Sequence, residues 1–403
     1  MRKMKDSGVA WIGEMPEDWT VKRGKFTLKL LNRPVKETDD VITCFRDGEV
    51  TLRTNRRTDG FTVSVKEIGY QGIEPGDLVI HGMDGFAGSI GISDSRGKSS
   101  PVLVVCDTDE NKRYIMYYLR SMAYNDVFTA LATGIRVRSC DLRWNKLAEL
   151  PYILPSLEEQ NQIVLAIESS TSKVDALIAN VQAQIEKLKT YKQSLITEVV
   201  TKGLDPNVPM KDSGVEWIGK IPKHWNMIRF RFIAKITTGN QDTQNADPDG
   251  MYPFYVRSPI VERCNNYTFE GKGILMAGDG AGAGRVFHLV NGKYAVHQRV
   301  YRFYDFKYMN PVLLKFYLEN LFATVMDYGS AKTTVPSVRL PMIQDFPVCV
   351  PPEDEQLKML EVLSEKTNKI DRFIAVKQTK IEKLEQYKRS LIYEYVTGKK
   401  EVS

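Results

Sequence analysis

The sequence predicts a mixed α/β (α+β) protein made of two similar halves, each with a variable body and a long helix. The first observation is a helix that occurs twice, as IEKLKTYKQSLITEVVTKG at 185–203 and as IEKLEQYKRSLIYEYVTGK at 381–399. The second is that shorter stretches before each body and before each helix also recur. The third is that the bodies themselves differ and read as short strands with one amphipathic helix each. Internal repeats of this kind decide the architecture of a chain.

The shorter repeats give the order of the parts. KDSGVAWIGEMPEDW at 5–19 recurs as KDSGVEWIGKIPKHW at 211–225, and PYILPSLEEQ before the first helix recurs as PVCVPPEDEQ before the second. Each half therefore runs from a head to a body, a proline-rich segment and a helix. We expect four parts: a first body at 1–155, a first helix at 156–204, a second body at 205–351 and a second helix at 352–403.

Each body is expected to form a small sheet covered by a helix. Apolar and alternating runs between turn residues predict strands at 77–81, 89–93, 102–106, 273–277, 285–290 and 296–303. Amphipathic patterns predict helices at 111–124 and 311–322, the second with Pro311 in its first turn. Four tryptophans recur in place in the heads, so we expect them to pack in the scaffold: Trp11, Trp19, Trp217 and Trp225.

Each repeated helix carries an apolar seam with steps of three and four residues, the pattern of a coiled coil. Ser156 suits an N-cap, and Gly203 and Gly398 mark the helix ends. An exposed seam of this length needs a partner, so we expect the two copies to pair antiparallel and to separate the bodies about a pseudo-two-fold axis. The residues expected to pair the helices and dock other subunits are Ile178, Val181, Ile185, Leu188, Leu195, Ile374, Ile381, Leu384 and Leu391.

One seam position holds a lysine in both copies, Lys192 and Lys388. Each lies either at the edge of the helix pair or at a docking point for another subunit. The duplication itself also has two readings. It gives two readers held at a fixed separation, or it merely gives a larger structural protein.

Composition sets broad limits. The net charge of +6 permits nucleic-acid binding without requiring it. The five cysteines are scattered without a CxxC pair, which disfavours a zinc site or a disulfide framework and fits a reducing cytoplasm. We expect no metal site, no membrane span and no secretion signal, and therefore a cytoplasmic protein.

Catalytic patterns are missing from the sequence. There is no GxxxxGK[ST] loop, no HExxH pair and no GxSxG elbow. The glycine run at 278–284 lacks GxGxxG spacing and reads as a strand turn with close backbone approach, although a phosphate-cradling enzyme loop remains an alternative. Pro351-Pro352 lacks the amide and the aromatic ring that an amino-methyltransferase loop needs.

The heads, the segments LPYILPSLEEQ and FPVCVPPEDEQ, and the helix ends SLITEVVTKG and SLIYEYVTG resemble the specificity (S) subunit of type I restriction-modification systems. The resemblance covers essentially the whole chain. In the second body, 273–276, Asp279-Gly280 and His297-Gln298-Arg299-Val300 are also similar to the target-recognition domains of that family. The first body keeps 76–80 and Asp84-Gly85 but has no Gln-Arg-Val.

The resemblance implies a non-catalytic subunit that binds double-stranded DNA. Its two target-recognition domains would each read half of a bipartite site, and the helices would set the gap and dock two modification subunits. S-adenosylmethionine would bind those methyltransferase subunits, and ATP and Mg would bind the restriction subunits. This chain would bind no cofactor. The alternative from another class is a structural adaptor that binds proteins through its variable domains.

Polar residues in expected loops are the candidates for DNA contact, since Arg pairs with guanine, Asn or Gln with adenine, and Lys holds phosphate. They are Arg53, Asn55, Arg56, Arg57, Lys98, Arg136 and Arg138 in the first body, and Asn240, Gln241, Gln244, Asn245, Arg257, Arg285 and Lys332 in the second. A set of tyrosines could flank DNA, although most aromatic residues in such a body are core: Tyr117, Tyr118, Tyr252, Tyr255, Tyr267 and Tyr301.

Overall fold

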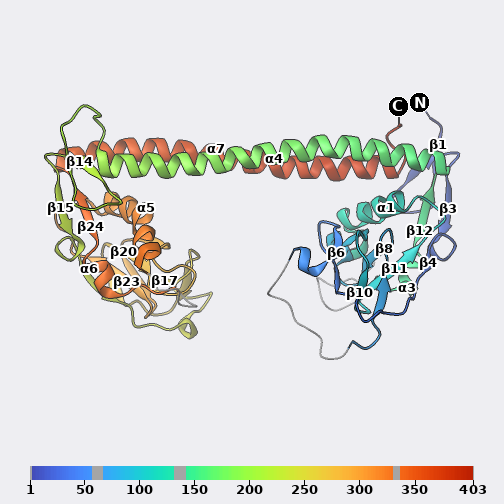
Figure 1. Cartoon of the computed structure of the whole chain (residues 1–403), viewed down its shortest axis with the longest axis horizontal. Helices are drawn as coiled ribbons and strands as arrows, with labels where there is room; N and C mark the ends of the chain where they lie inside the picture. The colour runs from blue at the N-terminus through green and yellow to red at the C-terminus, as the bar shows by residue number, and fades with distance from the viewer. Residues whose placement is uncertain (1, 57–66, 131–141, 330–335, 403) are drawn as a thin grey trace. The chain divides into compact units, whose positions relative to one another are not determined.

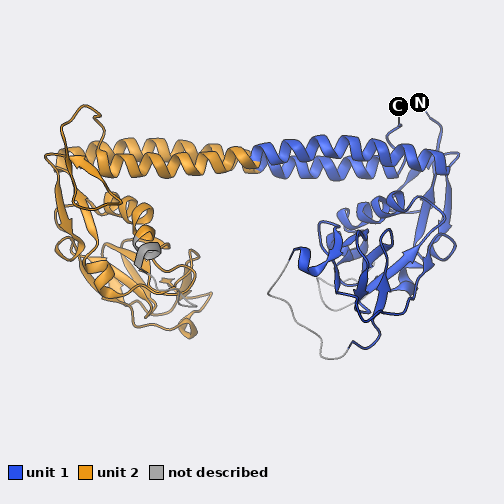
Figure 2. Ribbon diagram, viewed as in Figure 1, with its two compact units in different colours: residues 1–181, 379–403 blue, residues 182–378 orange. Residues whose placement is uncertain are grey.

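The computed structural model describes residues 2–56, 67–130, 142–329 and 336–402, with the side chains of 325–329 left out. These residues form two compact units (Figure 2). Unit 1 consists of residues 1–181 and 379–403, and unit 2 of residues 182–378. Each unit thus combines one body with parts of both long helices, which confirms the mixed α/β class with two long helices.

Unit 1 is built on a four-stranded antiparallel sheet with strand order β4-β11-β8-β9 (Figure 1). The first three residues of the central strand β8 are buried and its last residue is half-buried, so the strand is covered on both faces. Two strand pairs, β5-β6 and β7-β10, accompany this sheet. The strands are β4 Lys29–Leu30, β5 Ile42–Cys44, β6 Val50–Leu52, β7 Gln71–Ile73, β8 Leu78–His81, β9 Ile90–Ile92, β10 Gly97–Ser99 and β11 Leu103–Asp107.

Unit 2 repeats this sheet with strand order β16-β23-β20-β21. Its central strand β20 is buried at every residue. A second sheet has the order β18-β17-β22-β19, in which β17 and β22 run parallel. The strands are β16 Lys235–Thr238, β17 Tyr252–Tyr255, β18 Glu262–Cys264, β19 Phe269–Glu270, β20 Gly273–Ala277, β21 Phe287–Val290, β22 Lys293–Val296 and β23 Val300–Tyr304.

The repeated heads form the same two strand pairs in each unit. They are β1 Met4–Asp6 with β2 Glu14–Pro16 and β3 Thr20–Arg23 with β12 Pro151–Leu154 in unit 1, and β13 Met210–Asp212 with β14 Lys220–Pro222 and β15 Asn226–Arg229 with β24 Pro347–Val350 in unit 2. A 3-10 turn follows β3 and β15, at Gly24–Phe26 and Phe230–Phe232. Trp19 and Trp225 are fully buried in their heads, which confirms their scaffold role.

One helix packs against each main sheet, α1 Lys112–Tyr124 in unit 1 and α5 Pro311–Gly329 in unit 2 (Figure 1). The side chain of Asn111 accepts hydrogen bonds from the amides of Arg113 and Tyr114 and so caps α1. Shorter helices are α2 Val127–Ala130, α3 Trp144–Leu147 and α6 Leu340–Gln344.

The long helices are α4 Leu157–Lys202 and α7 Glu353–Val396, and α4 alone has 46 residues. The hydroxyl of Ser156 accepts a hydrogen bond from the amide of Glu159 at 3.3 Å, which confirms the expected cap. Gly203 and Gly398 follow the helices with φ of 80° and 70°. The long helices therefore begin and end where the sequence indicates.

The long helices pair antiparallel, which is clearest in unit 2, where Gln184 contacts Lys377 and Lys192 contacts Asp371. In unit 1, α7 packs Leu391 and Ile392 into a core that also holds Val174 of α4. Leu195 and Ile370 lie in the corresponding core of unit 2. Lys192 and Lys388 each make a salt bridge of 2.7 Å across the pair, to Asp371 and Asp175, so both lysines lie at its edge.

The expected strand at 296–303 is wrong. The structure divides it between β22 and β23, with a turn in which the amide of Val300 donates to the carbonyl of His297 at 2.9 Å. The alternation of apolar residues does not reveal this turn, because its residues are neither glycine nor proline. The turn matters because it carries Gln298 and Arg299 out of the sheet.

Candidate nucleic-acid interface

In unit 2 the glycine run follows β20 and makes a tight turn against its own backbone. The amide of Gly278 donates to the carbonyl of Arg299 at 2.9 Å, and a Cβ at Gly278 would lie 2.8 Å from that oxygen. A Cβ at Gly282 would lie 2.5 Å from the carbonyl oxygen of Arg257. Glycine is needed here because the segments carrying these two arginines approach too closely for any side chain.

Asp279, on this turn, holds both arginines. The guanidinium of Arg257 donates to its carboxylate at 3.1 Å, and the Nε of Arg299 lies 3.8 Å from the same carboxylate. Both arginines remain largely exposed. One carboxylate thus orients two guanidinium groups while leaving donors free for the edge of a base or a phosphate.

The segment 240–245 lies beside the turn at 297–300 that carries Gln298 and Arg299. The amide of Gln298 donates to the carbonyl of Gln241 at 2.8 Å, and the side chain of Gln298 donates to Asp242 at 2.7 Å. Asp242 is the N-cap of a short 3-10 turn at Thr243–Asn245, and its amide donates to the side-chain oxygen of Asn245 at 2.8 Å. Thr243, Arg257 and Asp279 line one hollow. Among the second-body candidates, the structure therefore brings Gln241, Asn245 and Arg257 together around these turns. Gln244 lies within the 3-10 turn and Arg285 directly follows the glycine run, whereas the side-chain oxygen of Asn240 accepts from the hydroxyl of Thr268 at 3.2 Å.

In unit 1 the turn after β8, residues 82–88, carries a related pair. Arg46 donates to Asp84 at 3.1 Å, and Arg46 comes from the loop between β5 and β6. Arg56 packs over the ring of Phe45, 4.2 Å from its centroid, and pairs with Asp47 at 2.7 Å. The guanidinium of Arg56 is therefore engaged by a carboxylate of its own unit.

The other described candidates of unit 1 are spread out. Arg53 lies 3.4 Å from the hydroxyl of Thr43, and Asn55 donates to Thr51 at 2.7 Å. Lys98 pairs with Glu67 at 2.7 Å on β10. The remaining candidates lie outside the described residues: Arg57, Arg136, Arg138 and Lys332.

Three residues at these turns were not among the predicted DNA-contact residues: Arg46, Gln298 and Arg299. Gln298 and Arg299 stand in the His-Gln-Arg-Val motif that carried the family resemblance, and this signal could have found them. Arg46 carries no such signal, because it meets Asp84 only through the fold.

A histidine supports one turn in each unit, His81 half-buried in unit 1 and His297 buried in unit 2. The Nδ1 of His81 accepts the amide of Asp84 at 3.0 Å, and the Nδ1 of His297 accepts the amide of Arg299 at 3.0 Å. Burial lowers the pKa of both imidazoles below the ordinary value. In each ring the Nδ1 accepts an amide hydrogen, which requires that this nitrogen carry no proton of its own.

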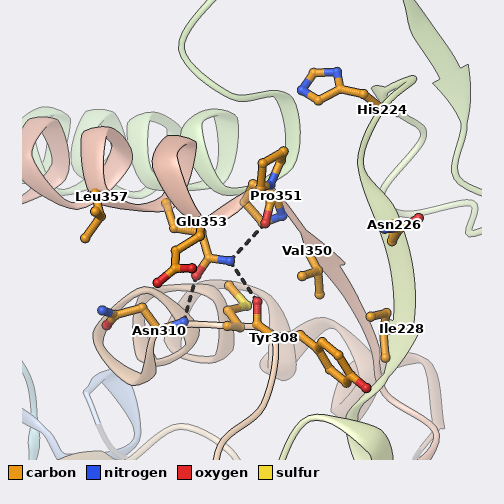
Figure 3. A pocket seen from close by; sticks show the side chains of 12 residues that line it. His224, Asn226, Ile228, Tyr308, Asn310, Val350, Pro351, Glu353 and Leu357 are labelled. Carbon is orange, nitrogen blue, oxygen red and sulfur yellow. Dashed lines mark hydrogen bonds between the residues drawn. The ribbon is translucent and has the colours of Figure 1, made fainter.

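A second hollow in unit 2 belongs to the scaffold. Figure 3 shows this hollow with Tyr308, Asn310 and Pro351 at its wall, and Gln356 also lines it. The side chain of Gln356 accepts the amide of Asn310 at 2.7 Å and donates to the carbonyls of Tyr308 at 2.8 Å and Pro351 at 2.9 Å. Because the amide group of Gln356 is committed to these bonds, it fixes the start of α7 and is not available to a ligand.

The candidate tyrosines Tyr118, Tyr252 and Tyr267 pack within their own units, and the described residues offer no metal site and no membrane span. Tyr118 is buried and donates to the carbonyl of Pro151 at 2.7 Å, as a core tyrosine does. Tyr252 and Tyr267 pack against each other with centroids 5.1 Å apart. In the described ranges, no group of three or more His, Cys, Asp or Glu residues could hold a metal ion. None of the described helices is long and apolar enough to cross a membrane.

Known proteins are similar to this chain in sequence. The family model for the type I restriction modification DNA specificity domain matches residues 222–386. The specificity subunit of the type I restriction enzyme EcoDI from Escherichia coli is 28% identical over 173 residues, which are 42% of this chain and 35% of that protein. The MjaVIII specificity subunit from Methanocaldococcus jannaschii is 23% identical over 430 residues, covering 96% of this chain and 93% of that protein.

A solved structure also matches. It is a chain from work on complex assembly and conformational transition of the type I R-M system. It has a TM-score of 0.71 and 14% sequence identity, and the match covers 95% of this chain and 99% of that chain. At this identity the likeness shows the fold.

Proposed function

We propose that the chain is a specificity subunit of the type I restriction-modification family and serves as the sequence-specific DNA-binding subunit of such a system. It reads a bipartite target and directs partner methyltransferase and restriction subunits to it. It is not itself the catalytic component. We place it in the cytoplasm, where it meets its DNA.

The observation that carries this proposal is the turn that each unit builds at one end of its main sheet. Each turn holds an exposed arginine by a carboxylate, Arg257 by Asp279 and Arg46 by Asp84. An arginine oriented in this way can offer paired donors to a guanine in the major groove. The side chains around the two turns differ, as two readers of unlike half-sites require.

We propose that the bodies at 1–155 and 205–351 are the two target-recognition domains and that the helices at 156–204 and 352–403 are the spacer. The proposed DNA-contacting residues are the candidate set given above, extended by Arg46, Gln298 and Arg299. Arg56 and Lys98 form salt bridges with carboxylates of unit 1. To contact DNA, each would have to release its carboxylate and bind a phosphate or a base instead.

The helices also offer a docking surface for two modification subunits. Tyr387 and Leu177 are exposed on the helices of unit 1, and Tyr191 and Phe373 occupy the equivalent repeat positions in unit 2. Large apolar side chains left in water on both copies of a repeat are typical of an interface. S-adenosylmethionine would bind these partners, and ATP and Mg would bind the restriction subunits. This chain would bind no cofactor.

The decisive test is the pattern of DNA methylation in cells that carry the complete system. Long-read mapping of methylated adenines should show one bipartite motif. Exchanging residues 226–346 for the body of a relative with another specificity should change one half of the motif and leave the other half and the gap unchanged. Methylation of mixed sequences without any motif would contradict the reader function.

Salt dependence separates a DNA reader from a protein-binding adaptor. The affinity of the reconstituted complex for its target duplex should fall steeply as salt rises from about 50 to 200 mM, because bound cations leave the phosphates. A protein-binding adaptor would give no specific duplex binding at any salt concentration. The same duplex with both half-sites scrambled serves as the control.

A further inference from the structure

The two units share a surface patch that the reading function does not use. In unit 1, Phe26 ends the 3-10 turn after β3 with 74% of its surface exposed, and in unit 2 the equivalent Phe232 is 61% exposed. The segments RGKFTLKL at 23–30 and RFRFIAKI at 229–236 share this phenylalanine and the cations around it. We call these two surfaces the phenylalanine patches.

The same ion pairs frame each patch. In unit 1, Arg23 and Lys25 both pair with Glu149, at 2.7 and 3.4 Å. In unit 2, Arg229 and Arg231 both pair with Asp345, Arg229 at 3.3 Å. A lysine lies three residues beyond each phenylalanine and forms a salt bridge with an aspartate. Lys29 pairs with Asp109, which follows β11, and Lys235 pairs with Asp305, which follows β23.

The backbone holds each patch rigidly. The amide of Gly24 donates to the carbonyl of Leu150, and the amide of Phe230 donates to the carbonyl of Phe346, both at 2.9 Å. The turns therefore present Phe26 and Phe232 from fixed positions. Folding does not explain this arrangement, because each ring lies in water where an apolar side chain gains little.

We propose that the phenylalanine patches are a duplicated docking site for the modification subunit, one copy to each unit, beyond any contact that it makes with the long helices. This proposal rests on the proposed function. Two patches of the same design, on bodies that otherwise differ, fit a partner that binds the chain twice through the same surface. A reader of unlike half-sites has no use for two patches of the same design.

The chemistry of the patch defines the surface of the partner. In unit 2, Phe232 borders a hollow lined also by Tyr308 and Leu340, both exposed. Cations outnumber carboxylates around this hollow. The carboxylates are Asp305 and Asp345, and the cations are Arg229, Arg231, Lys235 and Lys307. The partner should therefore offer an apolar socket for the ring with carboxylates at its rim.

Within unit 2 the patch leaves room for DNA. Lys235 begins β16 and pairs with Tyr304 at the end of β23, whereas the candidate segment 240–245 follows the other end of β16. At about 3.3 Å per residue, the patch and the reading turn lie on the order of 10 Å or more apart along these strands. Because the centre of the patch is an exposed phenylalanine ring, which an apolar socket on a protein can bury and a phosphate backbone cannot, protein is favoured over DNA as the occupant.

The test measures binding of the purified modification subunit to the full chain by native mass spectrometry and by calorimetry. Phe26→Ser and Phe232→Ser should each weaken one of two binding events about tenfold or more, since a central aromatic anchor is typically a hot spot. The double variant should weaken both. Phe232→Leu should retain most of the affinity, because the socket is still filled by an apolar side chain.

The matched controls are Ile68→Ser and Met251→Ser, which alter exposed apolar residues of unit 1 and unit 2 that are not part of the patches. They should leave binding unchanged, and all variants should melt like the parent chain. Unchanged affinity in the double variant would overturn the proposal. So would a loss confined to DNA affinity, or a loss of self-association in sedimentation that identifies a second copy of this chain as the occupant.

Failure of this proposal is distinguishable from failure of the proposed function. If only the docking proposal is wrong, the double variant still assembles and still methylates one bipartite motif. If the proposed function is wrong, the unaltered chain itself neither recruits the modification subunit nor gives a motif.

Discussion

The turns at the ends of the two main sheets have the same backbone plan but different side chains. Gly82 and Gly278 leave their central strands in the same way, each donating its amide to the residue before the neighbouring strand, Val102 or Arg299. Where unit 2 has Gln298 and Arg299, unit 1 has Pro101 and Val102. The fold thus fixes a position next to the turn and leaves its chemistry free to vary.

The opposite ends of the same units show no such freedom. The indole of Trp19 donates to Glu159 at 3.0 Å, and the indole of Trp225 donates to Glu355 at 2.9 Å. Gln160 accepts the amide of Asn111 just as Gln356 accepts the amide of Asn310. The comparison teaches that the helix ends hold each body by one repeated set of bonds, which lets the body change elsewhere.

The largest effect should come from the tryptophans, and it should be equal in both units. Trp19→Ala and Trp225→Ala each remove a fully buried indole and should cost about 3–5 kcal/mol in the unit that carries the change. Hydrogen exchange read separately for each unit measures this. Trp225→Phe, which keeps a ring but loses the bond to Glu355, should cost less. Loss in only one unit would contradict an equal scaffold.

The next effect should separate the units. Arg299→Ala should weaken binding of the assembled complex to its target duplex by about 1–3 kcal/mol and relax the sequence preference in one half-site, because one base contact is lost. Val102→Ala, at the equivalent position of unit 1, should change neither. Competition binding against duplexes altered in one half-site at a time is the measurement. Equal effects of both variants would contradict the proposal that the two turns share a backbone plan but differ in the side chains that contact DNA.

A pH effect is expected in unit 1. Hydrogen bonds from Arg96 lower the pKa of Asp39 to about 2, below its ordinary value of 3.8. A lowered pKa in the folded state stabilises the fold above the ordinary pKa, and this stability is lost as the pH falls through the folded value. Unit 1 should therefore lose protection between about pH 4 and 2, and Asp39→Asn should lose this pH dependence. Hydrogen exchange of unit 1 across that pH range is the measurement. Protection that does not change with pH would show that the Asp39–Arg96 pair contributes nothing to stability.

The smallest effect should again be equal. Lys192→Ala and Lys388→Ala each remove an exposed salt bridge across the helix pair and should cost no more than about 1 kcal/mol. Thermal melts at low and high salt measure this, and the difference from the parent chain should shrink as salt rises. A much larger loss of modification-subunit binding than of stability would instead assign the lysines to docking.

Elements that depend on local pattern were predicted well. The helix at 111–124 is observed at Lys112–Tyr124 because Asn111 caps it, and the strand at 273–277 is observed at Gly273–Ala277. The pairs β17-β18 and β5-β6 were missed, since strands of three or four residues carry too little alternation to stand out. The strand at 296–303 was predicted as one because its turn holds ordinary polar residues.

The sequence by itself determined the duplication, the two long helices with their caps and the scaffold tryptophans, because repeats, periodicity and capping residues are properties of neighbours in the chain. Only the tertiary structure decided which charged residues meet. Arg257, Asp279 and Arg299 come from three separate segments, and Arg46 reaches Asp84 across another loop. The same holds for Phe26 and Phe232, whose exposure depends on how each 3-10 turn packs against residues more than a hundred positions away.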